Sequence, residues 1–269
     1  MKKVLIHFNA GKPAAVAAAK KVAAGAKKAG LEIVGASRAS EASVVLVIGG
    51  DGTMLGAAHA YPGVPLLGLN FGSLGFLADV EERDFAKAVK AVAAGRYTVS
   101  ERVALSVLGK TGFNEVVISR GVSGHAALLE LSVDGRFAAK FLADGLAFST
   151  PTGSTAYSLA AGGPILLPET RCFVVTPICP HSLSSRPLVL PDTSSFKVVL
   201  EPRPGAEAAT VFADGERAGR LEAGAALEIV RSGRTLRLVR LKSADPFKSL
   251  NRKLGWTGAS LRADPRSAG

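Results

Sequence analysis

Along the first hundred residues, short apolar runs alternate with longer segments that carry apolar residues at helical spacing. The apolar runs have the length and composition of buried strands and lie at residues 3–8, 31–34, 44–48 and 65–69. An alanine-rich stretch after the first run has Pro13 near its first turn and Gly30 just past its last, which is typical of a helix. Residues 85–95 show apolar side chains at three- and four-residue spacing, which predicts another helix. This alternation predicts a parallel sheet in a Rossmann-like α/β amino-terminal domain.

After the first hundred residues the pattern changes to short β-rich runs separated by turns. The runs lie at residues 102–108, 114–119, 127–133, 137–142, 171–176, 188–190, 196–200, 210–213, 227–230 and 235–239. Asp134-Gly135 and Asp214-Gly215 stand between flanking runs, where hairpin turns are expected. We therefore expect a second, mostly β domain.

The last segment of the chain carries apolar residues at a spacing that indicates an apolar strip: Phe247, Leu250, Leu254 and Trp256. Such a strip has to pack on another part of the molecule, and we expect it to pack back on the first domain. The sequence thus divides into an α/β domain, a β-rich domain and a tail, at residues 1–100, 101–241 and 242–269.

Composition and charge narrow the class of protein. The chain has 269 residues, 48% of them hydrophobic, so it can bury a substantial core, and no apolar run approaches the length of a membrane span. The amino terminus lacks the long apolar region of a signal peptide, so we expect a cytoplasmic protein. The formal charge of +11 favours polyanionic partners. Because the basic residues are dispersed and only 6% of residues are aromatic, we expect a phosphorylated small molecule, with neither nucleic acid nor a membrane as partner.

The cysteines and histidines do not form a recognisable set of metal ligands. Cys172 and Cys179 have no second pair, which fits neither a disulfide framework nor a zinc site, so we expect two buried, reduced thiols. The four histidines are scattered at His7, His59, His125 and His181. The sequence therefore predicts no metal site built from protein ligands.

The segment VVLVIGGDGT, residues 44–53, combines a buried strand with a glycine-flanked carboxylate. Asp51 follows directly where open α/β sheets bind ligands, beyond the carboxyl end of a strand. Gly52 and Thr53 then lead into a short helix. Two interpretations are open from the spacing alone: Asp51 acts on a ligand, or Asp51 and Thr53 only cap the helix.

Two further stretches favour a ligand site. Residues 67–79 contain three glycines that allow a tight loop, and Asn70 and Phe76 could face the same crevice as Asp51. Residues 143–164 are rich in small and polar side chains. Within them, the hydroxyls of Ser154, Thr155 and Ser158 would suit phosphate and ribose at the start of a short helix.

Together these motifs closely resemble the bacterial NAD kinases, over nearly the whole chain. The matching motifs are GGDGT at residues 49–53, LGFLAD at 74–79, Asn-Glu at 114–115, DGLAFSTPTGSTAYSLAAGGPIL at 144–166, PHSLSSRPLV at 180–189 and KLGW at 253–256. GGDGT is shared with lipid kinases and phosphofructokinases, so it implies only phosphoryl transfer from a nucleotide. The TGSTAYS passage narrows the acceptor to NAD.

The resemblance implies a role for each matching residue. Asp51 would be the base that takes the proton from the adenosine 2′-hydroxyl of NAD. The other residues implied at the NAD site are Gly52 and Phe76, Asn114 and Glu115 at the adenosine, His125, Asp144 near the nicotinamide-side ribose, and Thr155, Ala156, Tyr157 and Ser158. One position departs from the family, because many relatives carry Arg where this chain has Leu142.

The resemblance also implies a fold, a cofactor and an assembly. The α/β domain would be joined to a carboxyl-terminal β-sandwich, and the enzyme would be a homodimer or homotetramer. ATP, or inorganic polyphosphate, would be the phosphoryl donor, with Mg²⁺ or another divalent cation delivered with ATP. Two alternatives are a lipid or other small-molecule kinase that shares GGDGT, and a basic nucleic-acid-binding protein.

Overall fold

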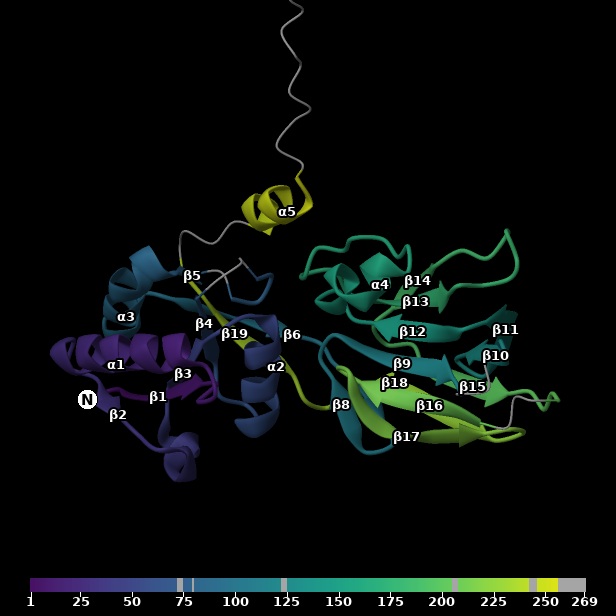
Figure 1. The fold of residues 1–269 in the computed structure, drawn as a ribbon, viewed down its shortest axis with the longest axis horizontal. Helices are drawn as coiled ribbons and strands as arrows, with labels where there is room; N and C mark the ends of the chain where they lie inside the picture. The colour runs from purple at the N-terminus through teal and green to yellow at the C-terminus, as the bar shows by residue number, and fades with distance from the viewer. Residues whose placement is uncertain (72–74, 79, 122–124, 205–207, 242–245, 256–269) are drawn as a thin grey trace, which may run out of the picture. The chain divides into compact units, whose positions relative to one another are not determined.

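The computed structural model describes residues 1–71, 75–78, 80–121, 125–204, 208–241 and 246–255. The chain forms two compact units (Figure 1). The first consists of Met1–Ser100 together with Arg237–Gly269, and the second of Glu101–Leu236.

The first unit is built on one sheet, and its predicted α/β class is confirmed. In sheet order, the strands are β2 (Glu32–Ile33), β1 (Lys3–Phe8), β3 (Val44–Ile48), β4 (Leu66–Asn70), β19 (Leu236–Arg240) and β6 (Thr98–Arg102), with β5 (Val80–Glu81) paired to β4. The pairs from β2 to β19 are parallel, as the alternation of strands and helices predicts. All five residues of β3 are buried, because an apolar run without polar positions fits a strand covered on both faces.

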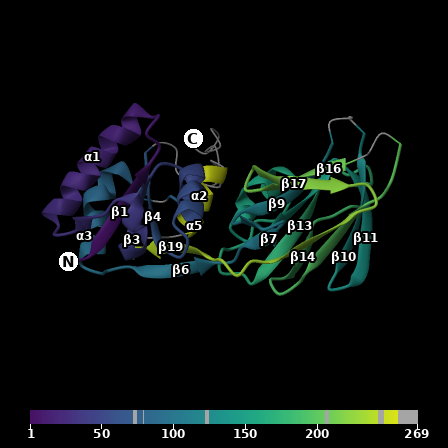
Figure 2. The same cartoon turned by 90° about the horizontal axis from the view of Figure 1, so that it is seen from below.

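Three helices accompany this sheet: α1 (Pro13–Lys28), α2 (Asp51–Ala60) and α3 (Phe85–Ala93). Figure 2 shows α1 and α3 side by side. Their small and apolar side chains, among them Ala18, Val22 and Val89, share one core cluster with β1, β3 and β4. Alanine on the packed face lets a helix approach its neighbours closely, which explains why a stretch with so few large side chains forms a core helix.

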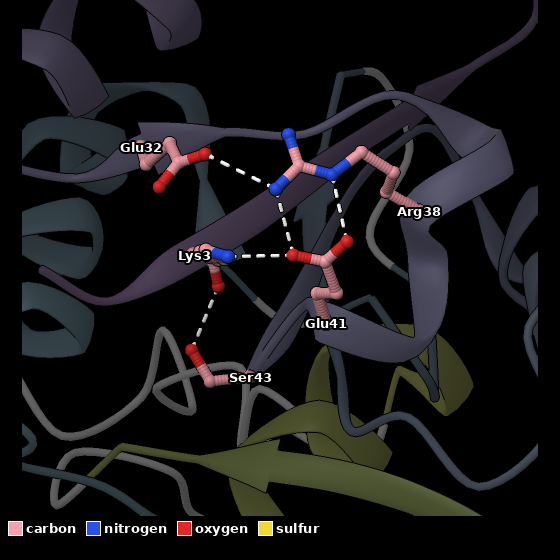
Figure 3. Close-up of polar contacts among 5 residues, drawn as sticks. All are labelled: Lys3, Glu32, Arg38, Glu41 and Ser43. Atoms are coloured by element: carbon pink, nitrogen blue, oxygen red, sulfur yellow. Dashed lines mark hydrogen bonds and ion pairs between the residues drawn. The ribbon is translucent and has the colours of Figure 1, made fainter.

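A network of charges fixes a turn that the sequence analysis missed, the 3₁₀ helix η1 (Ala36–Glu41) (Figure 3). The Glu41 carboxylate binds both Nε and Nη2 of Arg38, at 2.7 Å each, and Nζ of Lys3 at 2.5 Å. Hydrogen bonds from Arg38 and then Lys3 lower the pKa of Glu41 to about 2. Lys3 lies at the amino end of β1, whereas Asp51 follows the carboxyl end of the parallel strand β3. The network and Asp51 therefore lie at opposite ends of the strands.

The strand β19 differs from the expectation. Its residues were assigned to the second, β-rich domain, but they form a strand of the first sheet, where Leu238 pairs with Leu66 of β4. A short apolar run indicates a strand without identifying its partner, because pairing is decided by contacts distant in sequence.

The second unit is a β-sandwich, as the family resemblance implied. One sheet has the order β11 (Arg136–Ala143), β10 (Ala127–Val133), β15 (Phe196–Leu200), β18 (Ala226–Arg231), β7 (Leu105–Val107) and β8 (Lys110–Gly112). The other has the order β14 (Leu188–Pro191), β13 (Cys172–Ile178), β12 (Gly145–Ser149), β9 (Glu115–Arg120), β16 (Ala208–Ala213) and β17 (Glu216–Glu222). Apolar residues of both sheets, including Leu129, Phe148, Phe173 and Phe196, form a single core cluster.

The predicted hairpin turns are present at both positions. Asp134 and Gly135 have φ values of +50° and +75°, and Asp214 and Gly215 have +49° and +81°. Two successive residues with positive φ are the requirement of the tight turn that matches strand twist, which explains the Asp-Gly sequences.

The two cysteines and the tail differ in part from the expectation. Cys172 is buried as expected, but Cys179 is exposed, and both are free thiols. In the tail, the helix α5 (Pro246–Leu254) carries Leu250, which is buried, and Phe247, which is exposed. Trp256 lies outside the described residues.

Candidate active site

The structure places Asp51 at the first residue of α2, directly beyond β3, as predicted. The interpretation of Asp51 as a helix cap is wrong. Gly50 occupies the N-cap position of α2, and no side chain there makes a capping hydrogen bond. Instead the carboxylate accepts hydrogen bonds from the loop after β4. Oδ2 accepts the backbone N–H of Phe76 at 2.9 Å, and Oδ1 accepts those of Leu77 at 2.9 Å and Ala78 at 3.4 Å.

The loop can approach Asp51 this closely only because of a glycine. A Cβ atom at Gly75 would lie 2.0 Å from Oδ1 of Asp51, well inside van der Waals contact. The glycine spacing in the sequence indicated a tight loop, and the structure gives a reason at Gly75: residues 75–78 surround the carboxylate.

A lysine that the sequence analysis gave no role also lies at Asp51. The Lys253 ammonium, on α5, is 3.6 Å from Oδ2 of Asp51 and 4.1 Å from the centre of the Phe76 ring. Phe76 therefore belongs to the surroundings of Asp51, as expected, through its backbone N–H and its ring.

In the second unit, the backbone of Asn114 and Glu115 is held in place by the side chain of Asp214. The Asp214 carboxylate accepts the N–H groups of Phe113 at 2.8 Å, Asn114 at 2.7 Å and Glu115 at 3.3 Å. The carbonyl of Glu115 in turn accepts the N–H of Asp214 at 3.0 Å. Asp214 was predicted only as a turn residue, so the sequence analysis missed its contact with the Asn-Glu pair.

The Glu115 side chain is buried and only partly satisfied. It is 8% exposed, and its Oε2 atom has no hydrogen-bond partner among the described residues. Burial, and then the nearby negative charge of Asp214, raise the pKa of Glu115 to about 7, while the backbone N–H of Tyr157 lowers it. A buried acceptor without a partner is costly unless a ligand or water binds there.

The hydroxyl-rich passage packs directly against Asn114. Thr150 donates its N–H to the carbonyl of Asn114 at 2.9 Å, and its hydroxyl to the carbonyl of Phe113 at 2.7 Å. Gly153, in the 3₁₀ helix η3 (Gly153–Thr155), is so close that a Cβ atom would lie 2.0 Å from the Asn114 carbonyl oxygen. The structure therefore brings together the Asn-Glu pair and the TGSTAYS segment.

The hydroxyls of this passage differ in their availability. Ser154 is fully buried and donates to the carbonyl of Pro151 at 2.7 Å, and Ser158 is fully buried and shares a 2.8 Å hydrogen bond with Thr176. Tyr157, which opens α4 (Tyr157–Ala160), is 45% exposed, and Thr155 is partly exposed. Two of the serine hydroxyls thus stabilise the loop itself.

Asp144 lies at the other end of β12 from Thr150. Its carboxylate is 2.6 Å from Nε of Arg120. The five residues of β12 lie between Asp144 and Thr150, so six residue steps of extended chain separate the two, or about 20 Å. The two groups would therefore meet different parts of an extended ligand.

The same end of the unit contains a cavity of about 240 Å³. It is lined by His125, Ala126, Leu142, His181, Arg203 and Pro204. His125, predicted as a dinucleotide contact, thus lines a cavity with Leu142, the position that departs from the family.

Family models match both units of the chain. A model described as the ATP-NAD kinase N-terminal domain matches residues 12–97, and one described as the ATP-NAD kinase C-terminal domain matches residues 113–241. The chain belongs to the NAD kinase family.

NAD kinases from several bacteria are similar over most of their length. The NAD kinase of Syntrophotalea carbinolica is 36% identical over 284 residues, covering 95% of this chain and 99% of the relative. The NAD kinase of Protochlamydia amoebophila is 44% identical over 219 residues, covering 78% and 77%.

Two solved structures of the family share the fold. Yeast NADH kinase complexed with NADH has a TM-score of 0.84 at 24% identity, covering 96% of this chain and 89% of that one. The Archaeoglobus fulgidus NAD kinase in complex with ATP has a TM-score of 0.79 at 23% identity, covering 96% and 100%.

Two findings hold for the part of the chain that the structure describes. No group of three or more His, Cys, Asp or Glu side chains there could hold a metal ion. None of the helices there combines the length and hydrophobicity that a membrane span requires.

Proposed function

We propose that this NAD kinase transfers the γ-phosphoryl group of ATP to the adenosine 2′-hydroxyl of NAD, with Asp51 as the base. The observation that carries this assignment is the setting of Asp51, whose two carboxylate oxygens accept three backbone N–H groups at the carboxyl end of a parallel strand. A carboxylate fixed in this way needs no reorientation when a hydroxyl is presented to it.

The chemistry limits what Asp51 can do. A carboxylate is a much weaker base than an alkoxide, so Asp51 cannot fully deprotonate a ribose hydroxyl before reaction. Its role is to orient the hydroxyl and accept the proton as the oxygen–phosphorus bond forms.

We assign Asn114, Glu115 and the segment from Thr155 to Ser158 to the adenosine part of NAD. The support is the unpartnered Oε2 of Glu115, which suits an N–H or O–H donor of the ligand, beside the packed TGSTAYS passage. Asp144 and His125, beyond the opposite end of β12, are assigned to the remainder of the dinucleotide.

A divalent cation would enter with the nucleotide. Because the described residues contain no ready cluster of protein ligands, its ligands would be the phosphates with one or two carboxylates. Bound there, the cation would neutralise charge on the phosphates.

We also propose that the chain forms a homodimer or homotetramer. The support is the edge strand β14, where Leu188 and Val189 are exposed, and the nearby exposed Leu183. Exposed apolar side chains on an unpaired strand edge favour contact with another chain. Sedimentation velocity measures the assembly, and a monomer at micromolar concentration would contradict it.

The deciding experiment combines the pure protein with NAD, ATP and Mg²⁺ and measures NADP formation. Parallel reactions with polyphosphate in place of ATP, and with a diacylglycerol in place of NAD, separate the donor and acceptor alternatives. We expect NADP from the parent protein, and a rate lower by about 10² to 10⁴ for Asp51→Asn with NAD binding retained. Equal rates for the two proteins would remove Asp51 from the role of base. Binding of nucleic acid that weakens steeply as salt is added, without NADP formation, would favour a nucleic-acid-binding protein.

A further inference from the structure

The carboxyl-terminal helix α5 is attached to the first unit through its last turn. One residue of the helix, Leu250, is buried, at 6% exposed. The Arg252 guanidinium forms an ion pair with Glu81 of β5. These contacts fix the last turn of the helix, from which Lys253 extends to Asp51.

Lys253 is held by two different partners at once. Its ammonium lies 3.6 Å from Oδ2 of Asp51 and 4.1 Å from the centre of the Phe76 ring. The side chains of Lys253 and Asp51 are 27% and 31% exposed, so both charges are partly shielded from water and still reachable by a ligand. The aromatic face attracts the ammonium independently of the carboxylate.

We propose that Lys253 is a catalytic residue whose ammonium binds the phosphoryl group while it is transferred beside Asp51. This inference rests on the proposed function, because it requires Asp51 to act at the acceptor hydroxyl. In that step the 2′-oxygen of NAD forms a bond to the γ-phosphorus, and the bond from that phosphorus to the bridging oxygen breaks. The hydroxyl proton passes to Asp51, and ADP leaves with the electron pair of the broken bond.

The distance from Lys253 to Asp51 brings the ammonium close to the reacting group. The reacting phosphorus must come within bonding distance of the hydroxyl that Asp51 contacts. A cation 3.6 Å from the same carboxylate is therefore within reach of the phosphoryl oxygens, given the rotatable bonds of a lysine side chain.

The positive charge of Lys253 also reduces an electrostatic cost of the transfer. Transfer brings a negatively charged phosphoryl group next to a carboxylate, and the two repel each other. A fixed cation between them offsets this repulsion where charge is spread over the phosphoryl oxygens.

Asp51 has no purely structural need for the cation. Asp51 is already fixed by the N–H groups of Phe76, Leu77 and Ala78, so it does not depend on Lys253 for its orientation. The Phe76 ring keeps the ammonium in place when it exchanges the carboxylate for a phosphoryl oxygen.

The experiment compares kinetic constants for Lys253→Met, Lys253→Arg and a matched control. Methionine keeps an unbranched stem without the charge, and arginine restores the charge. The control is Lys87→Met. Lys87 is an exposed lysine on α3 that also has a carboxylate partner, Asp84, at 3.0 Å. Glu81→Gln weakens the attachment of α5 and leaves Lys253 intact.

We expect Lys253→Met to lower kcat by about 10² while the KM for NAD changes less than about threefold, as for removal of a group that stabilises transition-state charge. Lys253→Arg should recover at least about tenfold of that loss, and Lys87→Met should match the parent.

A kcat of Lys253→Met within about threefold of the parent would overturn the proposal. So would equal losses in Lys253→Met and Glu81→Gln without rescue by arginine, since that result assigns Lys253 only to docking of α5. A parent protein that makes no NADP would instead refute the proposed function. The thermal unfolding midpoint of each variant, measured alongside, ensures that folded proteins are compared.

Discussion

Asp51 in the first unit and Asp214 in the second fix a loop in the same way. Each carboxylate accepts the N–H groups of three consecutive residues, Phe76–Ala78 at 2.9, 2.9 and 3.4 Å and Phe113–Glu115 at 2.8, 2.7 and 3.3 Å. Asp51 follows Gly49-Gly50, and Asp214 follows β16 and begins an Asp-Gly turn, so neither local sequence indicates this role.

The two aspartates differ in the charge beside them. Asp51 has the ammonium of Lys253 at 3.6 Å, whereas Asp214 is close enough to Glu115 to raise its pKa. The same backbone arrangement thus serves two purposes. At Asp51 the loop positions the carboxylate that we propose as the base, and at Asp214 the carboxylate positions Asn114 and Glu115, which we propose to bind NAD.

Among variants that test how these two loops are fixed, the largest effect is expected from Gly75→Ala, which disturbs the loop around Asp51. The added Cβ would lie 2.0 Å from Oδ1, so the loop or the carboxylate must move. We expect kcat to fall by about 10², since small misplacements of a reacting group carry losses of this size. Steady-state kinetics measures it.

Gly25→Ala is the matched control for that substitution. Gly25 lies inside α1, and nothing is within 4 Å of its added Cβ. Alanine should stabilise the helix by up to about 1 kcal/mol and leave kcat unchanged. Loss of kcat in both variants would show that the effect at Gly75 is not local to Asp51.

A smaller effect is expected from Asp214→Asn, and it should appear in binding rather than in chemistry. An amide accepts fewer of the three N–H groups, so Asn114 and Glu115 become less well fixed. We expect the Kd for NAD, measured by calorimetry, to rise about tenfold, the size of one lost charged hydrogen bond, with kcat nearly retained.

Asp134→Asn is its counterpart in the other hairpin turn. Asp134 has the same positive φ, and its carboxylate accepts the N–H of Ser195 at 2.8 Å. Its replacement should change stability without changing NAD affinity. An equal loss of affinity in both variants would remove the special role of Asp214.

The smallest effect concerns pH. Because the pKa of Glu115 is raised to about 7 from an ordinary 4.5, the folded protein holds this proton more tightly than the unfolded chain does. The free energy of unfolding should therefore fall as pH rises from 4.5 to about 7. Asp214→Asn removes the second cause of the raised pKa and should reduce this fall by on the order of 1 kcal/mol.

Urea unfolding at pH 5 and pH 8 measures that difference. Glu115→Gln, which cannot ionise, is the reference without the contribution of Glu115. A parent protein whose pH dependence equals that of Glu115→Gln would contradict the raised pKa.

The sequence predicted those parts of the fold that depend on local patterns. The five apolar residues of β3 fixed both its bounds and its burial, and the Asp-Gly pairs gave both hairpin turns. It could not place β19 in the first sheet, because the register of Leu238 with Leu66 depends on a contact far along the chain.

The same limit holds for the candidate site. The position of Asp51 beyond β3 followed from the motif, whereas Lys253 and Asp214 reach their partners from distant elements. The Asp-Gly sequence was interpreted as a turn, and positive φ is a sufficient reason for an aspartate there. The sequence therefore gave no reason to expect that the Asp214 carboxylate also accepts the N–H of Asn114. The hydroxyls of Ser154 and Ser158 illustrate the converse, since the sequence suggested a ligand for both, and both have buried protein partners, Pro151 in the same loop and Thr176 in β13.

The order of strands β4, β19 and β6 has a consequence for biosynthesis. The ribosome completes β4 and β6 long before it makes β19, which lies between them and follows the entire second unit in the chain. Until then only the two-residue strand β5 pairs with β4 on that side, and Leu66, which later pairs with β19, lies at an unpaired strand edge of the nascent amino-terminal segment. Maturation of the first unit therefore waits for nearly the whole polypeptide, so a chain interrupted early yields an unfinished sheet rather than a free-standing domain.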